Sequence, residues 1–420
     1  MVQTKNKFDV AVIGGGPAGM MAAIWAARSG AETILIERNE TLGKKLLLTG
    51  GGRCNFANAE NDLRRLVVGY GKTGPFLFHA FSEFGPQAVV DFFNDLGIKT
   101  VVEDNGRVFP KSGLANEVLA ALLRTLKESG VEIRFNSTVT GVKKENGSIN
   151  QIILSGGEIV KAKNHIIATG GKSHPATGST GEGYNWAHDL GHCIEKLKPA
   201  LVPLKTKETW AKNLSGVSLK NAGIAVFQNG KKVFRDNGEI LFAHFGLSGP
   251  AILGISGRVG ELLEKGEVTI SLNPLPESNL DALEKDLHAK FSKNPNRQLA
   301  NCLTDVIPQS IAAAVCGIAD IDAEKTVNDI TRAQRRLLAV TILDLRLSVT
   351  GLMDIESGMV TGGGVALESI DDKTMRSKVI LNLFFGGEII DVHGRTGGYN
   401  LLQCWSTGRL AGISAAKTVK

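Results

Sequence analysis

The first hydrophobic segment of the chain predicts a buried strand followed by a helix. Residues 8–13, FDVAVI, are apolar and rich in β-branched side chains, and GGGPAG follows them directly. Residues 20–29 are rich in alanine, and Gly30 ends this helical stretch. A short apolar run, Thr33 to Ile36, comes next. Strand, glycine turn, helix and strand in this order are typical of a βαβ unit with a parallel sheet.

Later segments predict that the chain returns to the same sheet. Asn164 to Gly171 (NHIIATGG) has the pattern of a strand ending in a flexible turn, and Val379 to Glu388 (VILNLFFGGE) has that of a second strand. Leu401 to Lys417 has the spacing of an amphipathic helix. We therefore expect a nucleotide-binding type of domain that is built from both ends of the chain and interrupted by an insertion.

The first part of the middle region predicts a helix and a small β-meander. Leu114 to Glu128 has apolar residues on one helical face, with Gly130 as its stop. Strands at 131–135 and 149–154 are expected to flank a turn at Asn146-Gly147.

Beyond Pro199 and Pro203 the pattern changes to short strands, which fit a barrel. The strands are expected at 224–234, with a turn at Asn229-Gly230, at 240–245 and at 268–272. From Leu280 to Leu343 the pattern is helical and charged, with breaks at Pro295 and Pro308. This stretch predicts a helical subdomain.

Composition fits a folded multidomain protein. The 420 residues exceed the roughly 150 of an ordinary domain, and 43% hydrophobic with 21% charged residues excludes disordered and fibrous classes. Glycine is in excess, at 50 residues, and gathers in the turns named here. The net charge of +6, without a run of like charges, suits an anionic ligand but predicts no nucleic-acid arm.

Cysteine usage and hydropathy indicate a reducing, aqueous compartment. The five cysteines are widely spaced and contain no CxxC, which argues against a disulfide scaffold and a zinc site, so we expect no metal. Asp9 and the Gly14–Pro17 turn interrupt the N-terminal apolar stretch, and no segment reaches the length of a membrane span. We expect a cytoplasmic protein.

The glycine turn carries a dinucleotide fingerprint. Gly14, Gly16 and Gly19 have GxGxxG spacing, which allows a tight turn, close approach to a pyrophosphate and close packing of helix on strand. Glu37, 18 residues after Gly19, ends the second strand, where a carboxylate accepts hydrogen bonds from a ribose. The carboxylate disfavours a 2′-phosphate, so NADP is not expected at this site.

The remaining clusters favour FAD over NAD. A helix beginning near Gly397 and Gly398 would direct unpaired N–H groups at the N1 and C2 carbonyl edge of a flavin, and Glu388 would lie near the ribityl chain. A plain strand-loop-helix return stays open for this segment. A second fingerprint, and with it a dedicated NAD(P)H domain, is not visible.

Several further motifs together are similar to those of the BaiN/YhiN-like family of FAD-binding flavoproteins. They are GKKLLLTGGGRCN ending at Asn55, HPATGSTGEGYNWAHDLGH at 174–192, HFGLSGPAIL at 244–253, TGGGV at 361–365 and the closing GGEIIDVHGRTGGYNLLQCWSTGRLAG. The resemblance covers essentially the whole chain. It implies an α/β fold with an FAD-binding Rossmann-like domain of the glutathione-reductase type and an inserted β-barrel-like domain that carries a small helical subdomain.

The resemblance also implies boundaries and cofactor contacts. We expect the FAD domain at 1–197 and 352–420, the barrel domain at 198–275 and 340–351, and the helical subdomain at 276–339. The predicted FAD contacts are Gly14, Gly16, Pro17, Ala18, Gly19, Glu37, Arg38, Lys45, Thr49, Gly51, Gly52, Arg53, Cys54, Asn55, Ala168, Thr169, Gly170, Gly387, Glu388, Gly398, Tyr399 and Asn400.

Three residues are candidates for catalysis. His393 and Arg395 precede the helix expected to meet the flavin, and His174 lies in a Gly-, Ser- and Pro-rich loop. His393 and Arg395 also depart from the family pattern, as does Ala243, which leaves a borrowed substrate without support. For His174 a structural role stays open. Cys54 has no neighbouring cysteine, so a disulfide-reductase pair is excluded and packing is favoured over nucleophilic attack.

The predicted function is that of an FAD-dependent oxidoreductase. It would act by hydride transfer on a small organic substrate between the FAD domain and the barrel, with NADH or NADPH as a transient reductant. The alternative is a flavoprotein that modifies RNA, with a basic face near Arg332, Arg335 and Arg336, although a solvated face is the favoured interpretation of these charges. Arg107 is a candidate for binding an anion, or is part of a surface turn. The substrate and the oligomeric state stay open.

Overall fold

The computed structural model describes residues 7–419, which form two compact units. One unit contains the described residues up to Ala200 together with those from Ile355 onward, and the other runs from Leu201 to Asp354. The first unit therefore consists of two stretches of chain separated by the second unit.

The first unit is built on a mixed sheet with the strand order β6-β2-β1-β9-β8-β7, with β18 paired to β9 on a branch. Strands β6, β2, β1, β9 and β18 run parallel, whereas β7 and β8 are antiparallel. The strands are β1 (Lys7–Ile13), β2 (Thr33–Ile36), β6 (Glu132–Arg134), β7 (Val139–Glu145), β8 (Ser148–Leu154), β9 (Ile159–Ile167) and β18 (Leu383–Phe385). The parallel part has the Rossmann arrangement expected from the sequence.

Two details of this sheet differ from the prediction. The strand expected at 131–135 is β6, which pairs with β2 in the main sheet, and the meander consists of β7, β8 and β9. Of 379–388, only Leu383–Phe385 forms a strand. Just before it, the Asn382 amide accepts from the Ile149 N–H at 2.8 Å and donates to the Ile149 carbonyl at 2.9 Å. A side chain thus replaces strand pairing at this point.

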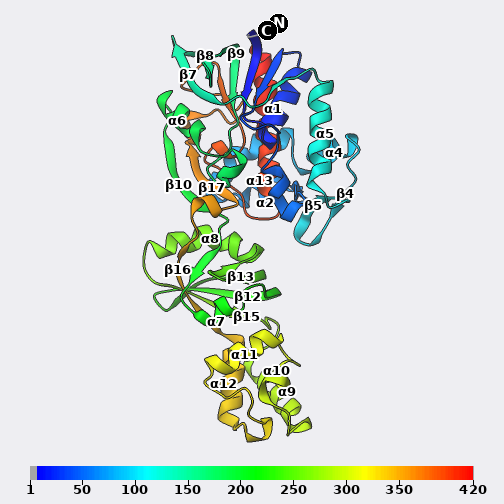
Figure 1. Cartoon of the computed structure of the whole chain (residues 1–420), viewed down its shortest axis with the longest axis vertical. Coiled ribbons are helices and arrows are strands. Elements are labelled where there is room, and N and C mark those ends of the chain that lie inside the picture. Colours follow the sequence, from blue (N-terminus) through cyan, green and yellow to red (C-terminus); the bar gives the residue numbers. More distant parts are fainter. Residues whose placement is uncertain (1–6, 420) are drawn as a thin grey trace. The chain divides into compact units, whose positions relative to one another are not determined.

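Helices α1 (Pro17–Arg28) and α13 (Tyr399–Lys417) pack closely and run parallel (Figure 1). A Cβ at Gly408 would lie 2.3 Å from the Ala18 carbonyl oxygen, and one at Gly412 would lie 2.3 Å from that of Ala22. The same four-residue step on both helices fixes their direction. Because α13 begins nine residues before Gly408 and α1 only one before Ala18, the start of α13 extends roughly 12 Å beyond the start of α1 on the N-terminal side.

Further elements surround this sheet. The helices are α2 (Leu63–Val68), α3 (Phe78–Glu83), α4 (Pro86–Asp95), α5 (Ala115–Glu128) and α6 (Glu182–Asp189). Strands β3 (Ala57–Asn58), β4 (Thr100–Val102) and β5 (Arg107–Pro110) form a small sheet, and β10 (Ile194–Ala200) pairs with β17 (Val360–Val365). The TGGGV glycines lie in β17, where a Cβ at Gly363 would be 2.3 Å from the Lys196 carbonyl oxygen. Strand packing therefore accounts for this cluster.

The second unit contains a closed barrel with the strand order β11-β14-β13-β12-β15-β16, followed in space by helices (Figure 1). Its strands are β11 (Leu204–Thr206), β12 (Ser218–Gln228), β13 (Lys231–Ala243), β14 (Gly246–Ser248), β15 (Val268–Asn273) and β16 (Leu345–Leu352). Its helices are α7 (Thr209–Asn213), α8 (Pro250–Leu263), α9 (Leu280–Lys293), α10 (Leu299–Leu303), α11 (Gln309–Ile318) and α12 (Arg332–Leu343).

The barrel strands are longer than the sequence pattern predicted. The segments expected at 231–234 and 240–245 belong to one strand, β13, which pairs with β12 along its length through two register shifts. The polar residues Asp236 and Asn237 hid this continuity, because they stand in the exposed middle of the hairpin. The turn at Asn229-Gly230 lies where it was predicted.

Candidate functional site

The first βαβ turn needs its glycines for close backbone contacts. Gly14 has φ +103°, and a Cβ there would lie 2.6 Å from the Ala168 carbonyl oxygen. A Cβ at Gly19 would lie 1.8 Å from the Gly14 carbonyl oxygen. A Cβ at Gly16, in contrast, would meet open space, and the start of α1 at Pro17 has no side-chain cap. Unpaired N–H groups at an open helix start favour an anion such as a pyrophosphate.

Glu37 fixes this turn from the end of β2. Its buried carboxylate accepts from the Gly15 N–H at 2.7 Å through Oε2 and from the Asn39 backbone and side chain at 2.8 and 2.7 Å through Oε1. Asn39 was not among the predicted residues. The guanidinium of Arg38 does not contact this turn. It makes an ion pair with Glu182 at 2.6 Å and donates to the Thr180 hydroxyl.

Lys45 and Glu388 form an ion pair in the first unit. Lys45 Nζ lies 2.7 Å from Glu388 Oε2 and donates to the Ser173 hydroxyl at 2.7 Å. Glu388 Oε1 accepts from the Thr361 N–H at 2.8 Å and from Ser173 Oγ at 3.1 Å. Burial raises the pKa of Glu388, but Lys45 and these donors outweigh it and hold that pKa below its usual value. Ser173 and Thr361 carried no signal in the sequence beyond their place in glycine-rich turns.

His174 follows Ser173 and lies near this ion pair. Its backbone is left-handed, with φ +53°, and its N–H donates to the Glu356 carbonyl at 3.0 Å. Burial and the charge of Lys45 lower the pKa of the imidazole, partly offset by Glu388. The imidazole is therefore favoured in its neutral form near pH 7.

The loop 168–170 and Gly387 complete one edge of this region. Thr169 Oγ1 is buried and has no hydrogen-bond partner within residues 7–419, and Gly170 has φ +72°. A Cβ at Gly387 would lie 2.6 Å from Ala18 Cβ, and the Gly387 N–H donates to the Thr407 hydroxyl at 2.9 Å. An unpartnered buried hydroxyl costs free energy unless a ligand satisfies it.

The TGGGRCN segment forms an irregular loop after a short 3₁₀ turn. Gly50, Gly51 and Gly52 all have positive φ, and a Cβ at Gly51 would meet open space. The Thr49 hydroxyl donates to the Leu46 carbonyl at 2.7 Å, which holds the start of the loop. Cys54 is fully buried, and this burial raises the pKa of its thiol to about 12. The thiol is therefore protonated and has a packing role rather than a nucleophilic one.

The start of α13 is held against β3. Gly398 has φ +94°, and a Cβ there would lie 2.0 Å from the Ala57 carbonyl oxygen. Oriented to satisfy its neighbours, the Asn55 amide accepts from the Gly398 N–H at 3.0 Å. Asn400 accepts from the Gly394 N–H at 2.8 Å and donates to the Gly394 carbonyl at 3.0 Å, which closes the loop before the helix.

Tyr399 and its neighbours form the first turn of α13. Tyr399 is buried, and its carbonyl accepts from the Tyr70 hydroxyl at 2.7 Å. The guanidinium of Arg395 donates to the Tyr399 hydroxyl at 2.5 Å and stacks on its ring at 4.7 Å. His393 is half-buried, and a Cβ at Gly362 would lie 3.3 Å from its Cε1. Arg395 thus borders the helix start, whereas His393 lies against β17.

Arg53 lies in a cluster that the sequence did not predict. Its guanidinium makes an ion pair with Glu103 at 2.5 Å and stacks on Phe109 at 4.1 Å. Arg107 approaches the same carboxylate at 3.4 Å. The two arginines lower the pKa of Glu103, chiefly through the hydrogen bond from Arg53.

The residues of the first unit fit a dinucleotide such as FAD. Two parallel helices, α1 and α13, begin without side-chain caps and point the same way, with starts offset by roughly 12 Å. The same unit has room for a ligand at Gly16 and Gly51, where a Cβ would meet no atom. It also contains the Thr169 hydroxyl, which has no hydrogen-bond partner among the described residues. The start of α1 suits a pyrophosphate, and the start of α13, which projects beyond it on the N-terminal side, suits the polar edge of a flavin.

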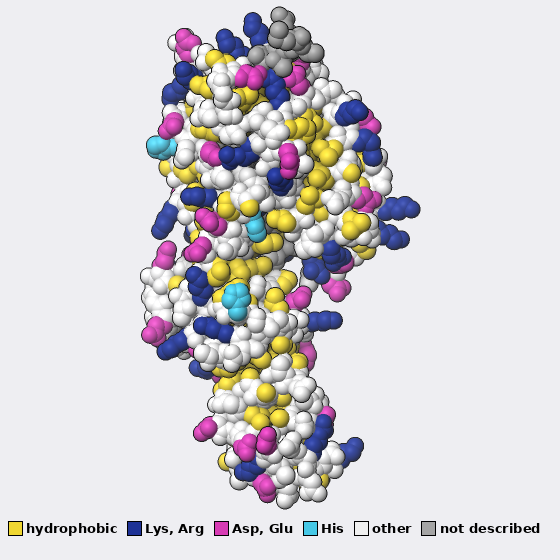
Figure 2. Space-filling view, viewed as in Figure 1, with side chains coloured by type: hydrophobic (Ala, Val, Ile, Leu, Met, Phe, Trp, Pro, Cys, Tyr) yellow, Lys and Arg dark blue, Asp and Glu magenta, His cyan; other side chains and the backbone are white. Residues whose placement is uncertain are grey.

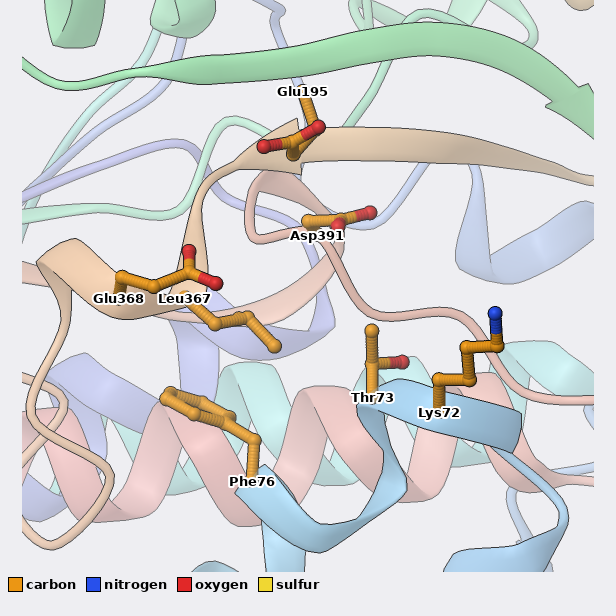
Figure 3. A pocket seen from close by; sticks show the side chains of 7 residues that line it. All are labelled: Lys72, Thr73, Phe76, Glu195, Leu367, Glu368 and Asp391. Atoms are coloured by element: carbon orange, nitrogen blue, oxygen red, sulfur yellow. The ribbon is translucent and has the colours of Figure 1, made fainter.

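A separate pocket of about 310 Å³ lies in the same unit (Figure 3). Its walls are formed by Lys72, Thr73, Phe76, Glu195, Leu367, Glu368 and Asp391. Burial and the charge of Glu195 raise the pKa of Asp391. Three carboxylates face one lysine here, so this pocket is unsuited to the phosphates of a dinucleotide.

Two further searches of residues 7–419 bear on the sequence expectations. Within this range, no group of three or more His, Cys, Asp or Glu side chains is arranged to hold a metal ion. The helices of the same range include none that is long and apolar enough to cross a membrane.

Comparisons with known proteins agree with this geometry. A family model described as "HI0933-like protein Rossmann domain" matches residues 8–414. The 3-dehydro-bile acid delta(4,6)-reductase of Clostridium scindens is 31% identical over 97% of this chain and 99% of its own. The ribosomal RNA dihydrouridine synthase of Escherichia coli is 30% identical over 96% of both chains.

Among solved structures, the 3-ketosteroid-delta4-(5alpha)-dehydrogenase of Rhodococcus jostii RHA1 has a similar fold. It aligns with a TM-score of 0.55 at 16% identity and covers 99% of this chain and 98% of its own. At this identity the likeness concerns the fold alone, which is that of Rossmann-type flavoenzymes.

Proposed function

Because the chain belongs to the HI0933-like family, which is a family of flavoprotein oxidoreductases, we propose that it is an FAD-dependent enzyme that reduces a carbon–carbon double bond of a small organic substrate. The observation that carries the proposal is the pair of uncapped, parallel helix starts of α1 and α13 beside the glycine turns. The names of both relatives describe hydrogen added across a carbon–carbon double bond, which supports this reaction class.

In this proposal the chain's residues hold the cofactor by its two ends. Glu37 would face the ribose of the adenosine, Gly16 and the start of α1 the pyrophosphate, and the start of α13 the flavin. FAD bound there supplies hydride chemistry. The overall reaction transfers a hydride from NADH or NADPH and a proton from the protein or water to the double bond, leaving NAD(P)⁺ and the saturated product.

Three side chains are proposed for the substrate side. His174 is a candidate for moving the proton. Because burial and Lys45 lower its pKa, only its minor imidazolium form could donate a proton near pH 7, and it would regain the proton from water. Arg395, fixed by Tyr399, and His393 would orient the carbonyl that makes the double bond electrophilic. Each role rests on the position of the residue in the first unit: His174 beside the Lys45–Glu388 pair, Arg395 beside the start of α13 and His393 against β17.

The proposal is tested by spectroscopy followed by a half-reaction. The purified protein should be yellow, and NADH or NADPH should bleach it without oxygen. A steroid with a 3-oxo-4,6-diene should then restore the colour, with stoichiometric loss of the diene absorbance. A colourless protein that cannot be reconstituted with FAD would disprove the proposal, and a reduced flavin that only oxygen reoxidises would disprove the reductase part.

A second candidate function is reduction of a uridine in ribosomal RNA. It is motivated by the two relatives named ribosomal RNA dihydrouridine synthase, from Escherichia coli and from Haemophilus influenzae, the latter 27% identical over 97% of this chain. Against it, Figure 2 shows acidic side chains interspersed with basic ones on the visible face, without a continuous basic stripe. Reoxidation of the reduced protein by an rRNA transcript, but not by the steroid, would favour this candidate.

A further inference from the structure

Arg53 and Arg107 both contact the Glu103 carboxylate, but Arg53 makes more and shorter bonds to it than Arg107 does. Arg53 holds Glu103 with both terminal nitrogens, at 2.5 and 3.4 Å, and stacks on Phe109 at 4.1 Å. Arg107 reaches Glu103 with a single bond of 3.4 Å and lies 5.8 Å from the Phe109 ring centre. Arg53 is therefore fixed, whereas Arg107 is held loosely.

Arg107 retains donors that nothing in the described chain satisfies. Its Nε is shielded from solvent and has no hydrogen-bond partner among the described residues, although its side chain is 35% exposed. A guanidinium carries five N–H donors in a fork that matches a carboxylate or a phosphate. An anion would bind the exposed part of the guanidinium, and it would satisfy Nε only if the atoms that cover this nitrogen moved aside.

Arg107 also lies beside the start of α13. It pairs with Asn58 between β5 and β3, and the Asn58 amide donates to the Gly397 carbonyl at 2.9 Å. A Cβ at Gly397 would lie 3.9 Å from Arg107 Cγ. The positive end of α13 lies beside this cluster, in which the two guanidiniums share the Glu103 carboxylate, so Arg53, Arg107 and Glu103 together carry a net positive charge.

We propose that Arg107 binds an anionic group of the substrate, a carboxylate or a phosphate, while Arg53 and Glu103 hold its side chain in place. This inference rests on the proposed reductase function and names the class of substrate. An anionic group bound beside the start of α13 would place the reacting part of the molecule next to the polar edge of the flavin. Both relatives have names of anionic substrates, a bile acid and a ribosomal RNA.

The test uses two pairs of probes that differ only in the anion. The first pair is 3-oxochol-4-en-24-oic acid and its methyl ester, and the second is uridine 5′-monophosphate and uridine. Each is titrated into the oxidised, FAD-loaded protein, and binding is followed by the change in flavin absorbance. We expect the wild type to bind the anionic member of one pair about tenfold or more tightly than the neutral one. The responding pair identifies the anion as carboxylate or phosphate.

The variants decide whether Arg107 is responsible. Arg107→Gln should bind both members of the pair equally, and Arg107→Lys, which keeps the charge without the fork, should retain part of the preference. Arg64→Gln removes the same charge from the exposed face of α2 and should leave the preference unchanged. FAD affinity should stay within about twofold of wild type in all three variants.

Several outcomes would overturn the inference. One is a wild type that binds neither anion in preference to its neutral partner, including a wild type that binds neither pair. Another is an Arg107→Gln variant that keeps the preference, and a third is one that no longer binds FAD, since Arg107 would then belong to the cofactor site. Failure of the reductase function itself shows earlier, in the bleaching and reoxidation experiment, and is therefore distinguishable.

Discussion

Lys45 Nζ and Glu388 Oε2 lie 2.7 Å apart although 343 residues separate them in the chain. The pair joins the loop after β2 to the loop after β18, with side-chain exposures of 19% and 14%. Ser173 and Thr361 bind the same carboxylate from two further segments. The ion pair and its two hydrogen bonds therefore connect four segments of the first unit. Two of them, with Lys45 and Ser173, precede the second unit in the chain, and two, with Thr361 and Glu388, follow it.

The Lys45–Glu388 pair should stabilise the fold of the first unit. Glu388→Gln leaves the Lys45 ammonium largely buried without its counter-charge, and we expect a loss of about 2–3 kcal/mol in the free energy of unfolding. Lys45→Met alone should cost a similar amount, but the double variant should lose less than the sum. Urea unfolding of the four proteins without FAD measures this coupling. Additive losses would show that the two side chains do not interact in solution.

Glu37 should control the affinity for FAD. Glu37→Gln removes the charged acceptor that holds the Gly15 and Asn39 donors, so the turn before α1 loses its fixed shape. We expect the dissociation constant of FAD to rise about tenfold. Quenching of flavin fluorescence on binding measures it. Glu40→Gln, an exposed carboxylate three residues further on, is the matched control and should bind FAD like the wild type.

The sequence predicted much of this site because glycine spacing reports backbone geometry directly. At Gly14 and Gly19 any side chain would collide with the backbone, so the fingerprint predicted both the turn and the helix that follows. Cys54 was correctly favoured as a packing residue, as its burial and its raised pKa indicate. The strand β18 also ends in the predicted glycine turn, although it is shorter than expected.

Other features could not be predicted, since they arise from contacts between distant segments. Ser173 and Thr361 are ordinary hydroxyl residues until the fold brings Glu388 between them. Glu103 likewise could not be assigned to a cluster from the sequence, because its partner Arg53 lies 50 residues earlier. The TGGGV glycines entered the sequence analysis only as a family motif, and their sequence does not show that Gly363 and Gly364 have close backbone neighbours on β10 and in the loop after β18.

Cys54 should be unreactive and dispensable for turnover. Its pKa of about 12 leaves almost no thiolate at pH 8, whereas Cys193 is exposed. Brief treatment with iodoacetamide, followed by mass spectrometry, should modify Cys193 and leave Cys54 intact. Cys54→Ser should retain flavin reduction by NADH or NADPH within about threefold. Labelling of Cys54 at the rate of Cys193, or loss of reduction in a folded Cys54→Ser protein, would restore a nucleophilic role.

His165 should make stability fall at acidic pH. It is fully buried in β9, and neither ring nitrogen has a hydrogen-bond partner of good geometry among residues 7–419. Burial, opposed in part by the Asn382 backbone, lowers its pKa to about 4. The unfolded chain takes up the proton near pH 6.5, so the free energy of unfolding is undiminished above that pH and decreases as the pH falls toward 4, by at most about 1.4 kcal/mol per pH unit.

The His165 effect is measured by urea unfolding between pH 4.5 and 7.5. His165→Leu, which has no proton to gain, should flatten the dependence and raise stability at pH 5 relative to the wild type. His188→Gln, at an exposed position in α6, should leave the slope as it is. An unchanged slope in His165→Leu would mean that other groups cause the acid sensitivity.

Close packing of α13 on α1 should be a requirement for both stability and cofactor binding. At Gly408 an added methyl group would lie 2.3 Å from the Ala18 carbonyl oxygen, which belongs to the first turn of α1. Gly408→Ala must therefore push the helices apart, at a cost of about 1–3 kcal/mol, and would displace the helix start that faces the pyrophosphate. We expect weaker FAD binding together with a lower melting temperature.

Gly317→Ala in α11 makes the same chemical change where a Cβ meets open space, and it should be neutral or slightly stabilising. If Gly408→Ala behaves like Gly317→Ala, the two helices are not in contact through this glycine, and the offset of their starts, on which the placement of FAD depends, has to be revised.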